Sequence, residues 1–427
     1  MRRRIHIGSA GAFASLMAKQ NIKGKSVMLK CAGILAAASF LWASVAFAEN
    51  APGVTATEIK VGGTFPFSGP VSSVGTTGKG LLAYISYLND KGGVGGRKIN
   101  YIALDDAYSP PKAVEQIRRL VESDEVAFLF SQLGTPSTAA TAKYLAARKV
   151  PSIAILSGAN AFTQYRDFPY ITTALPSFDT EGRIYAKYLK KVLPPDAKIA
   201  ILYQNDDFGK GYLAAFKAVF GDDFSRRTVL SPYELSEPSI ESHIINFKSA
   251  QAEALFIAGT GKFAAQSIRR SREIGWKPIT IINFASGSTA GTIVPAGVDN
   301  AVGVVSGTYS KDPTDPKWGN DLDIANYRTI FAKYLPGADI ADTGYLIGYR
   351  QGILLEQLLR QCGNDLSREN ILKQARNFKD LVLPTALPGI KINTNETNSK
   401  AWTQLQLQRW TGSTWELFGE VMDGDSD

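Results

Sequence analysis

The feature that most constrains the fold of this chain is a regular alternation of short apolar segments with amphipathic ones. Between residues 58 and 306, runs typical of strands buried on both faces alternate with segments whose apolar residues recur at helical spacing. The predicted strands are 58–65, 97–104, 126–131, 152–156, 198–203, 253–258, 279–283 and 301–306. The predicted helices are 77–90, 111–123, 137–148, 178–193, 209–220, 239–250 and 261–274. Because such strand–helix units form parallel sheets covered by helices, the predicted fold class is α/β.

The length of the chain argues against one continuous sheet. Its 427 residues exceed the roughly 250 to 300 residues at which one hydrophobic core splits into domains. The segment 172–177 ends one series of strand–helix units and precedes the helix that opens a second series. Beyond residue 306 the predicted elements are helices 317–335, 343–362 and 367–379 and hairpin strands 402–408 and 414–418. We therefore expect two lobes with more than one crossing between them.

The first 48 residues have the composition of a secretion signal. They contain seven basic residues and no acidic one, and the apolar run 32–45 is followed by an Ala-Phe-Ala sequence that ends at Ala48. We expect residues 1–48 to be a signal peptide that is cleaved near Ala48. A membrane anchor is disfavoured because the run is shorter than the roughly 20 apolar residues of a span. Met28 is an alternative start, which would leave residues 1–27 untranslated.

Charge and composition exclude several classes of function. Without the first 48 residues, 40 Lys and Arg face 39 Asp and Glu, so the electrostatic basis for binding nucleic acid is missing. The mature chain keeps one cysteine, Cys362, and one histidine, His243. A disulfide within the chain and a Cys/His zinc site are thereby excluded, and we predict neither a metal nor a cofactor. A hydrolase triad would have to use His243, which lies in a predicted helix.

Glycine-rich segments do not complete a nucleotide-binding motif. Around Gly78-Lys79, the position of the first glycine of a phosphate loop is occupied by Ser73, and Lys79 is followed by Gly80 in place of Ser or Thr. The hydroxyl that would hold magnesium is therefore missing. This pattern disfavours nucleotide binding.

Small and hydroxyl-bearing residues follow three predicted strands of the first series, at 68–70, 134–138 and 157–160. In doubly wound sheets, ligands bind outside the carboxyl ends of the strands. Helix N-termini there offer unpaired N–H groups to a carboxylate. The loops therefore predict a small anion site, although plain helix capping explains the same residues. In the second series, Phe208 lies at a strand-to-helix turn, where it either covers a ligand or packs beneath the turn.

Five motifs in order, at 62–70, 91–97, 203–210, 275–278 and 387–393, make residues 55–420 similar to a known family. The chain resembles the leucine/isoleucine/valine-type solute-binding proteins of ABC importers, which have the type I periplasmic binding protein fold. The resemblance implies two Rossmann-like lobes with parallel sheets, joined by a three-strand hinge, with the ligand enclosed between them.

The same resemblance implies where the lobes begin and end. The first lobe would comprise 50–176 plus 307–397, and the second 177–306 plus 398–427. The three long helices after residue 306 would then belong mainly to the first lobe.

The resemblance also implies a set of ligand-binding residues. Thr135 matches the family's hydroxyl residue that binds the ligand carboxylate. The loop that begins at Ser157, with Gly158 and Asn160, matches the segment whose backbone groups contact the ligand's carboxylate and ammonium. Val74 matches a position that lines the side-chain pocket.

Three further positions are implied on other segments. Phe208 matches an aromatic residue of the second lobe that closes over the ligand, and Thr260 lies near another contact of that lobe. Tyr345 lies close to a position that lines the pocket.

One departure from the family concerns the charge of the ligand. The acidic residue that pairs with an amino acid's ammonium is expected in the loop 283–288, but this loop contains no carboxylate, and Ala285 lies near its centre. An enclosed ammonium without a counter-charge is costly to bury. Either the ligand is an aromatic or branched organic acid, or another acid such as Asp106 or Asp207 serves an amino-acid ligand.

The resemblance implies a periplasmic receptor without catalytic activity that closes on a small carboxylate ligand. Its expected partner is an ABC permease complex in the inner membrane, with no nucleic acid, and the receptor is expected to be a monomer. Two alternatives remain at this point. One is a ligand-binding sensory module of the same fold, and the other is a secreted enzyme, for which Asp105 and Asp106 are the conspicuous acid/base candidates.

Overall fold

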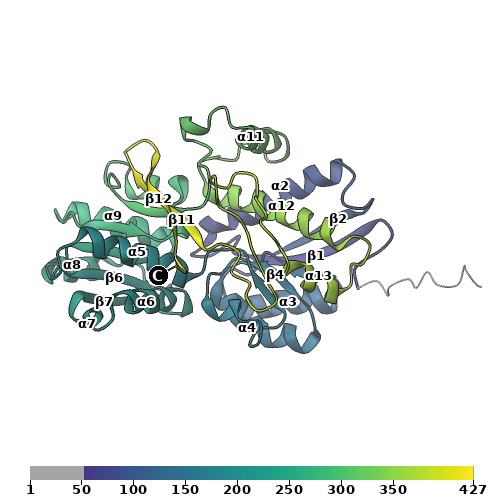
Figure 1. Ribbon diagram of the computed structural model, residues 1–427, viewed down its shortest axis with the longest axis horizontal. Coiled ribbons are helices and arrows are strands. Elements are labelled where there is room, and N and C mark those ends of the chain that lie inside the picture. The colour runs from purple at the N-terminus through teal and green to yellow at the C-terminus, as the bar shows by residue number, and fades with distance from the viewer. Residues whose placement is uncertain (1–51, 427) are drawn as a thin grey trace, which may run out of the picture. The chain divides into compact units, whose positions relative to one another are not determined.

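The computed structural model describes residues 52–426 of the chain. The predicted signal peptide, 1–48, lies outside the described residues. Strands and helices alternate along the described chain and build two separate sheets (Figure 1). The predicted α/β class is confirmed.

The first sheet has five parallel strands in the order β2-β1-β3-β4-β5. Its strands are β1 (Glu58–Phe65), β2 (Lys98–Asp105), β3 (Phe128–Phe130), β4 (Ser152–Ile155) and β5 (Ile171–Thr173). The connecting helices are α2 (Thr76–Asp90), α3 (Pro110–Glu122) and α4 (Thr135–Arg148), with the short helices η1 (Ser72–Gly75) and η2 (Asn160–Thr163). Strands β3 and β4 are buried along their whole length, because helices cover both faces of a parallel sheet.

The second sheet has seven strands in the order β12-β11-β10-β9-β8-β6-β7. Its parallel strands are β6 (Ile199–Gln204), β7 (Thr228–Tyr233), β8 (Ala254–Ala258), β9 (Ile279–Ile282) and β10 (Val305–Thr308), and an antiparallel hairpin, β11 (Gln404–Trp410) and β12 (Trp415–Asp423), extends it. The helices of this part are α5 (Phe178–Val192), α6 (Asp207–Phe220), α7 (Asp223–Arg227), α8 (Glu241–Ser249), α9 (Gly261–Glu273), η3 (Phe284–Ser286), η4 (Thr289–Ile293) and α10 (Val294–Ala296). The predicted terminal hairpin is confirmed.

The helices that follow β10 return to the first sheet. They are η5 (Pro316–Trp318), α11 (Leu322–Tyr334), α12 (Thr343–Cys362) and α13 (Arg368–Ala375). Helix α12 packs against α2, beside which it lies in Figure 1. The two backbones approach so closely that a Cβ added at Gly348 would lie 2.1 Å from the Thr77 carbonyl oxygen. Only glycine therefore fits at this position.

Sequence patterns missed or misplaced several elements. Strands β5 and β7 were not predicted. Strand β10 begins four residues later than the predicted strand 301–306. The predicted helix 317–335 is divided into η5 and α11, and α13 ends at Ala375 instead of residue 379. Strand β12 ends five residues beyond the predicted strand 414–418, and the other predicted helices and strands are present with ends that differ by up to two residues.

The chain passes between the two sheets three times, after β5, after β10 and before β11. The crossing segments contact one another. The indole N–H of Trp402 donates to the Ala174 carbonyl at 3.0 Å, and the rings of Tyr309 and Trp402 are 4.7 Å apart. The buried guanidinium of Arg350 lies 4.3 Å from the centre of the Tyr309 ring. These contacts pack the crossings into a cluster from which the two sheets extend.

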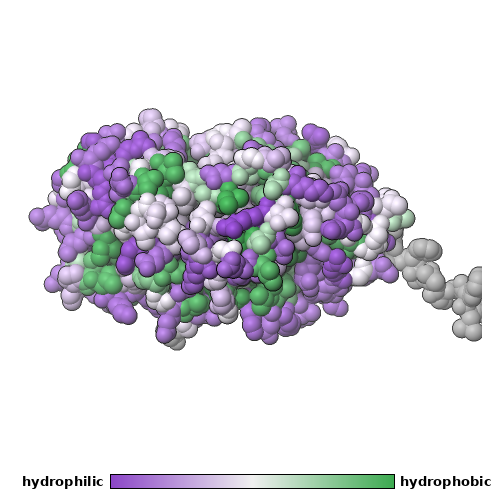
Figure 2. All heavy atoms as spheres, turned by 90° about the horizontal axis from the view of Figure 1, so that it is seen from above, coloured by the Kyte–Doolittle hydropathy of each residue, from purple (hydrophilic) through white to green (hydrophobic). Residues whose placement is uncertain are grey.

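The surface seen in Figure 2 is mainly hydrophilic, with hydrophobic residues in several separate groups. Among residues 52–426, no helix combines the length and the apolar character of a membrane span.

Candidate functional site

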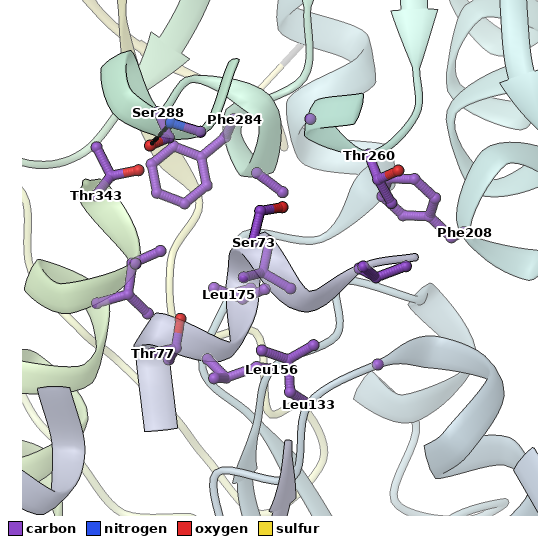
Figure 3. A pocket seen from close by; sticks show the side chains of 18 of the residues that line it. Ser73, Thr77, Leu133, Leu156, Leu175, Phe208, Thr260, Phe284, Ser288 and Thr343 are labelled. Atoms are coloured by element: carbon purple, nitrogen blue, oxygen red, sulfur yellow. Dashed lines mark hydrogen bonds between the residues drawn. The ribbon is translucent and has the colours of Figure 1, made fainter. Parts of the chain in front are cut away.

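A cavity lies between the loops at the ends of the two sheets (Figure 3). It encloses about 890 Å³ of empty space, part of which is open to solvent. The first sheet's part of the chain and α12 contribute Val71, Ser73, Val74, Thr77, Tyr108, Leu133, Gly134, Thr135, Leu156, Ser157, Asp342, Thr343, Gly344 and Ile347. The crossing after β5 and the second sheet's part contribute Leu175, Phe178, Phe208, Gly259, Thr260, Gly261, Phe284, Ala285, Ser288, Gly291 and Thr292. Both halves of the protein therefore form its wall.

Two hydroxyl groups meet at the start of α4. The Oγ1 atom of Thr135 and the Oγ atom of Ser157 are 2.7 Å apart, and the Ser157 hydroxyl also accepts from the Ala159 N–H at 3.2 Å. The preceding residue, Gly134, makes no side-chain cap, so the first N–H groups of α4 are left without one. Hydroxyls beside an uncapped helix N-terminus offer donors that a carboxylate can accept.

A second uncapped helix begins at the cavity from the other half. Thr260 occupies the N-cap position of α9 but makes no side-chain cap hydrogen bond. The hydroxyls of Thr260 and Thr292 are buried, line the cavity and have no hydrogen-bond partner among the described residues. Buried polar groups in proteins are nearly always hydrogen-bonded. These two hydroxyls therefore provide polar groups that a ligand in the cavity can satisfy.

Aromatic and aliphatic side chains form the rest of the wall. The rings of Phe178 and Phe208 are 5.1 Å apart in an edge-to-face arrangement, and both pack against Tyr212. Phe284, Leu133 and other apolar residues complete the enclosure. A wall with few polar groups favours a ligand whose body is apolar.

A buried carboxylate supports the wall from behind. Glu181 on α5 accepts hydrogen bonds from the hydroxyls of Tyr185 at 2.7 Å and Tyr212 at 2.6 Å, and from the Phe284 N–H at 2.5 Å. Burial raises the pKa of the Glu181 carboxyl, and the three donors oppose that rise. Because Phe284 opens the η3 turn, Glu181 fixes the position of a segment that lines the cavity.

Asp342 is an acidic residue of the cavity wall that sequence reasoning missed. It is the N-cap of α12, and its Oδ1 atom accepts from the Gly344 N–H at 2.9 Å and from the Ser288 hydroxyl at 3.4 Å. Burial raises the pKa of the Asp342 carboxyl, and these hydrogen bonds oppose the rise. An Asp directly before the predicted helix 343–362 was the available signal, but it indicated only a cap.

Of the nine residues predicted for the site, six line the cavity. They are Val74, Thr135, Ser157, Phe208, Thr260 and Ala285. The other three, Gly158, Asn160 and Tyr345, do not belong to its wall.

Local packing accounts for the three residues outside the wall. The Gly158 carbonyl accepts from the Phe178 N–H at 2.7 Å, so this glycine lies behind the Phe178 ring. The Asn160 side chain accepts from the Asp179 N–H at 3.3 Å. The Tyr345 ring packs against Phe331, 5.9 Å away.

The acids and the histidine considered from sequence lie elsewhere. Asp106 is fully buried and accepts from the Tyr108 N–H, Asp105 accepts from the Ser68 hydroxyl, and Asp207 is exposed. His243 lies between the Ser231 hydroxyl at 2.6 Å and the Glu237 carboxylate at 3.0 Å. These residues do not line the cavity, so their hydrogen bonds stabilise loops and helices.

Among residues 52–426, no group of three or more His, Cys, Asp or Glu side chains is placed to hold a metal ion.

Comparison with known proteins identifies the type of protein to which this cavity belongs. Among relatives in sequence, the Leu/Ile/Val-binding protein homolog 7 of Brucella abortus (strain 2308) is 24% identical over 84% of this chain and 91% of its own. The Leu/Ile/Val-binding protein of Escherichia coli (strain K12) is 25% identical over 64% of this chain and 73% of its own.

Solved structures share the fold. A branched chain amino acid ABC transporter protein from Thermus thermophilus with bound valine has a TM-score of 0.76 at 15% identity, over 87% of this chain and 97% of its own. A fatty acid ABC transporter substrate-binding protein from Thermomonospora curvata also has a TM-score of 0.76, at 19% identity, over 88% of this chain and 95% of its own.

A family model described as "Periplasmic binding protein" matches residues 58–414. That match includes the first sheet, every strand of the second sheet except β12, and every residue of the cavity wall. The resemblance found in the sequence is thereby confirmed, and the chain belongs to the periplasmic binding protein family.

Proposed function

We propose that this protein is the extracytoplasmic solute-binding receptor of an ABC importer of the branched-chain-amino-acid type. Its ligand is a small carboxylate with an apolar body, either a hydrophobic amino acid or an aromatic or branched organic acid. The observation that carries the proposal is a cavity with two uncapped helix N-termini and a hydroxyl pair in otherwise apolar walls. Relatives named for leucine, isoleucine and valine, and a neighbour named for fatty acids, support a carboxylate.

The ligand carboxylate binds between the starts of α4 and α9. Thr135 and Ser157 donate hydroxyl hydrogen bonds, and the helix N-termini contribute N–H groups and favourable dipoles. Phe208 and Thr260 approach from the other half and cover the ligand. An affinity in the micromolar range requires about 8 kcal/mol, which an enclosed small molecule with a charge-assisted anchor supplies.

The receptor closes on its ligand and releases it unchanged to a permease in the inner membrane. The halves 50–176 plus 307–397 and 177–306 plus 398–427 act as the two lobes, and the three crossings act as the hinge. The ligand favours the closed state because only that state offers contacts from both halves. We place the mature protein in the periplasm as a monomer, without catalytic activity.

A ligand screen tests this function. We expect at least one hydrophobic amino acid or aromatic or branched acid to raise the melting temperature and to bind with a measurable heat in titration calorimetry, because a ligand that binds only the folded state stabilises it. The bound compound should be recovered chemically unchanged after incubation. Turnover of the compound, or no stabilisation by any carboxylate in the screen, would refute the proposal.

Substitution of Thr135 tests the position of the carboxylate. Thr135→Ala removes a hydrogen bond to a charged group and should weaken binding by about 1 to 3 kcal/mol, as measured by calorimetry. Thr138→Ala is the matched control, because Thr138 lies on the same helix, is fully buried and does not line the cavity. An unchanged affinity in Thr135→Ala would remove Thr135 from the site.

A further inference from the structure

The carboxylate of Asp342 is the one acidic group on the cavity wall among the described residues. Only 9% of the surface of Asp342 is exposed. The part of the chain that the structure describes contains no ion pair between Asp342 and a Lys, Arg or His side chain, and the charge that acts on it is another acid, Asp339. A buried carboxylate is costly unless hydrogen-bond donors or a cation compensate it.

Helix capping accounts for only one of the two carboxylate oxygens. The Oδ1 atom accepts from the Gly344 N–H and the Ser288 hydroxyl, and the one other described donor that acts on the carboxyl is the Thr76 hydroxyl, whose hydrogen bond opposes the rise in its pKa. That hydroxyl has a single proton, for which the Ser73 carbonyl, 3.2 Å away, competes. One oxygen of Asp342 therefore remains available to accept a hydrogen bond.

Two other capping aspartates differ in this respect. Asp206 caps α6 through Oδ1, and its Oδ2 accepts from the Gln204 amide at 2.5 Å. Asp321 caps α11 through Oδ1, and its Oδ2 pairs with the Lys311 ammonium at 2.7 Å. In both, a side chain of the protein satisfies the second oxygen. At Asp342 a ligand in the cavity is in the position to do so.

The contacts of Asp342 place it on the side of the cavity opposite the start of α9. Its hydrogen-bond partner Ser288 and its neighbour Thr343 lie on one side of the pocket in Figure 3, whereas Thr260, at the start of α9, lies on the opposite side. Leu175 and Ser73 lie between these two sides in Figure 3, whereas Phe284 lies beside Ser288 and Thr343. The cavity thus has polar groups on both sides, with apolar side chains and the Ser73 hydroxyl between them.

We propose that the ligand carries a hydrogen-bond donor, a hydroxyl or an ammonium group, at the end remote from its carboxylate, and that Asp342 accepts it. This inference rests on the proposed function, since it takes the carboxylate to lie between α4 and α9. The class of ligand is an acid with an apolar or aromatic body and a donor at its far end. A para-hydroxylated aromatic acid has this form.

Matched pairs of compounds test the inference by calorimetry. The pairs are 3-phenylpropanoate with 3-(4-hydroxyphenyl)propanoate, and L-phenylalanine with L-tyrosine, which differ only in the terminal hydroxyl. We expect the hydroxylated member of at least one pair to bind about tenfold more tightly or better, as a hydrogen bond to a charged group provides. In Asp342→Asn, which keeps a good helix cap but removes the charge, this preference should fall below about threefold.

The control is Asp321→Asn, which makes the same change at a helix cap outside the cavity. It should leave the preference for the hydroxyl unchanged. Equal binding within each pair in the unmodified protein, or an equal loss for both members in Asp342→Asn, would overturn the inference and leave the proposed function standing. If neither member of either pair binds while another carboxylate does, the inference also fails. If no carboxylate binds at all, the proposed function itself fails.

Discussion

At the scale of single residues, Glu181 links the cavity wall to the stability of the fold. Its carboxyl is buried with three donors and no described cation in contact. Because burial raises the pKa of Glu181 above its ordinary value of 4.5, the folded state holds the proton more tightly than the unfolded state. The stabilising effect of that proton is fully present below pH 4.5 and is lost as the pH rises through the folded-state pKa.

We therefore expect the effect of Glu181→Gln to depend on pH. Glutamine has no ionisation cost, so the free energy of unfolding of the variant, relative to the unmodified protein, should be higher at pH 8 than at pH 5. Urea denaturation at both pH values measures this difference.

An exposed glutamate provides the control. The pKa of Glu122 is lowered by hydrogen bonds from Tyr144 and Arg148, so its carboxyl is ionised at both pH values. Glu122→Gln should change the free energy of unfolding equally at pH 5 and pH 8. If Glu181→Gln behaved in the same way, Glu181 would be ionised throughout, and its three donors would outweigh its burial.

At the scale of elements, the start of α4 depends on the backbone of Gly134. This residue has a φ of 112°, which glycine adopts without strain, and an added Cβ would lie 2.8 Å from the Tyr108 ring. Gly134→Ala should cost about 1 to 3 kcal/mol of stability through backbone strain. It should also weaken ligand binding, because both Tyr108 and the first turn of α4 line the cavity.

Gly363→Ala separates these two effects. Gly363 follows α12 with a φ of 63°, and an added Cβ there meets no atom within 4 Å. We expect this control to lose stability, measured by denaturation, but to keep the ligand affinity, measured by calorimetry. If Gly134→Ala also kept its affinity, α4 would not form the carboxylate site.

The elements also show what the sequence can predict. Strands such as β6 and β8 are continuous apolar runs buried on both faces, so their pattern is strong. Strand β5 has only three residues, and β7 is a partly exposed edge strand that contains Pro232, so neither gives such a signal. The buried residues Ala301 and Val304 lie in turns before β10, which explains why that strand was placed too early.

The sequence predicted the residues of the cavity only where they lie in loops that directly follow strands. Thr135 and Ser157 follow strands of the first sheet, and the rule that ligands bind at the carboxyl ends of strands applies to them. Asp342 caps a helix that packs on the first half only after the chain has passed between the two sheets twice. Its presence in the wall depends on three-dimensional packing, which no local pattern records.

At the scale of the whole molecule, the two sheets have separate helices and are joined by three crossing segments. One polar contact across the cavity is the hydrogen bond between the Ser288 hydroxyl and Asp342. An arrangement of this kind favours hinge motion over deformation of either half, because each half keeps its own packed interior. Ligand bound between the halves adds contacts that exist only when they are close together.

Small-angle X-ray scattering tests this motion. Saturation with a ligand identified by the screen should reduce the radius of gyration, because the ligand shifts the population towards the closed state. Thr135→Ala, titrated with the same ligand, should reach the same reduced radius only at higher concentration, since closure follows occupancy. Thr138→Ala should follow the unmodified protein. Identical scattering with and without ligand, at a concentration that calorimetry shows to be saturating, would mean that the halves form one rigid body and that ligand enters a preformed cavity.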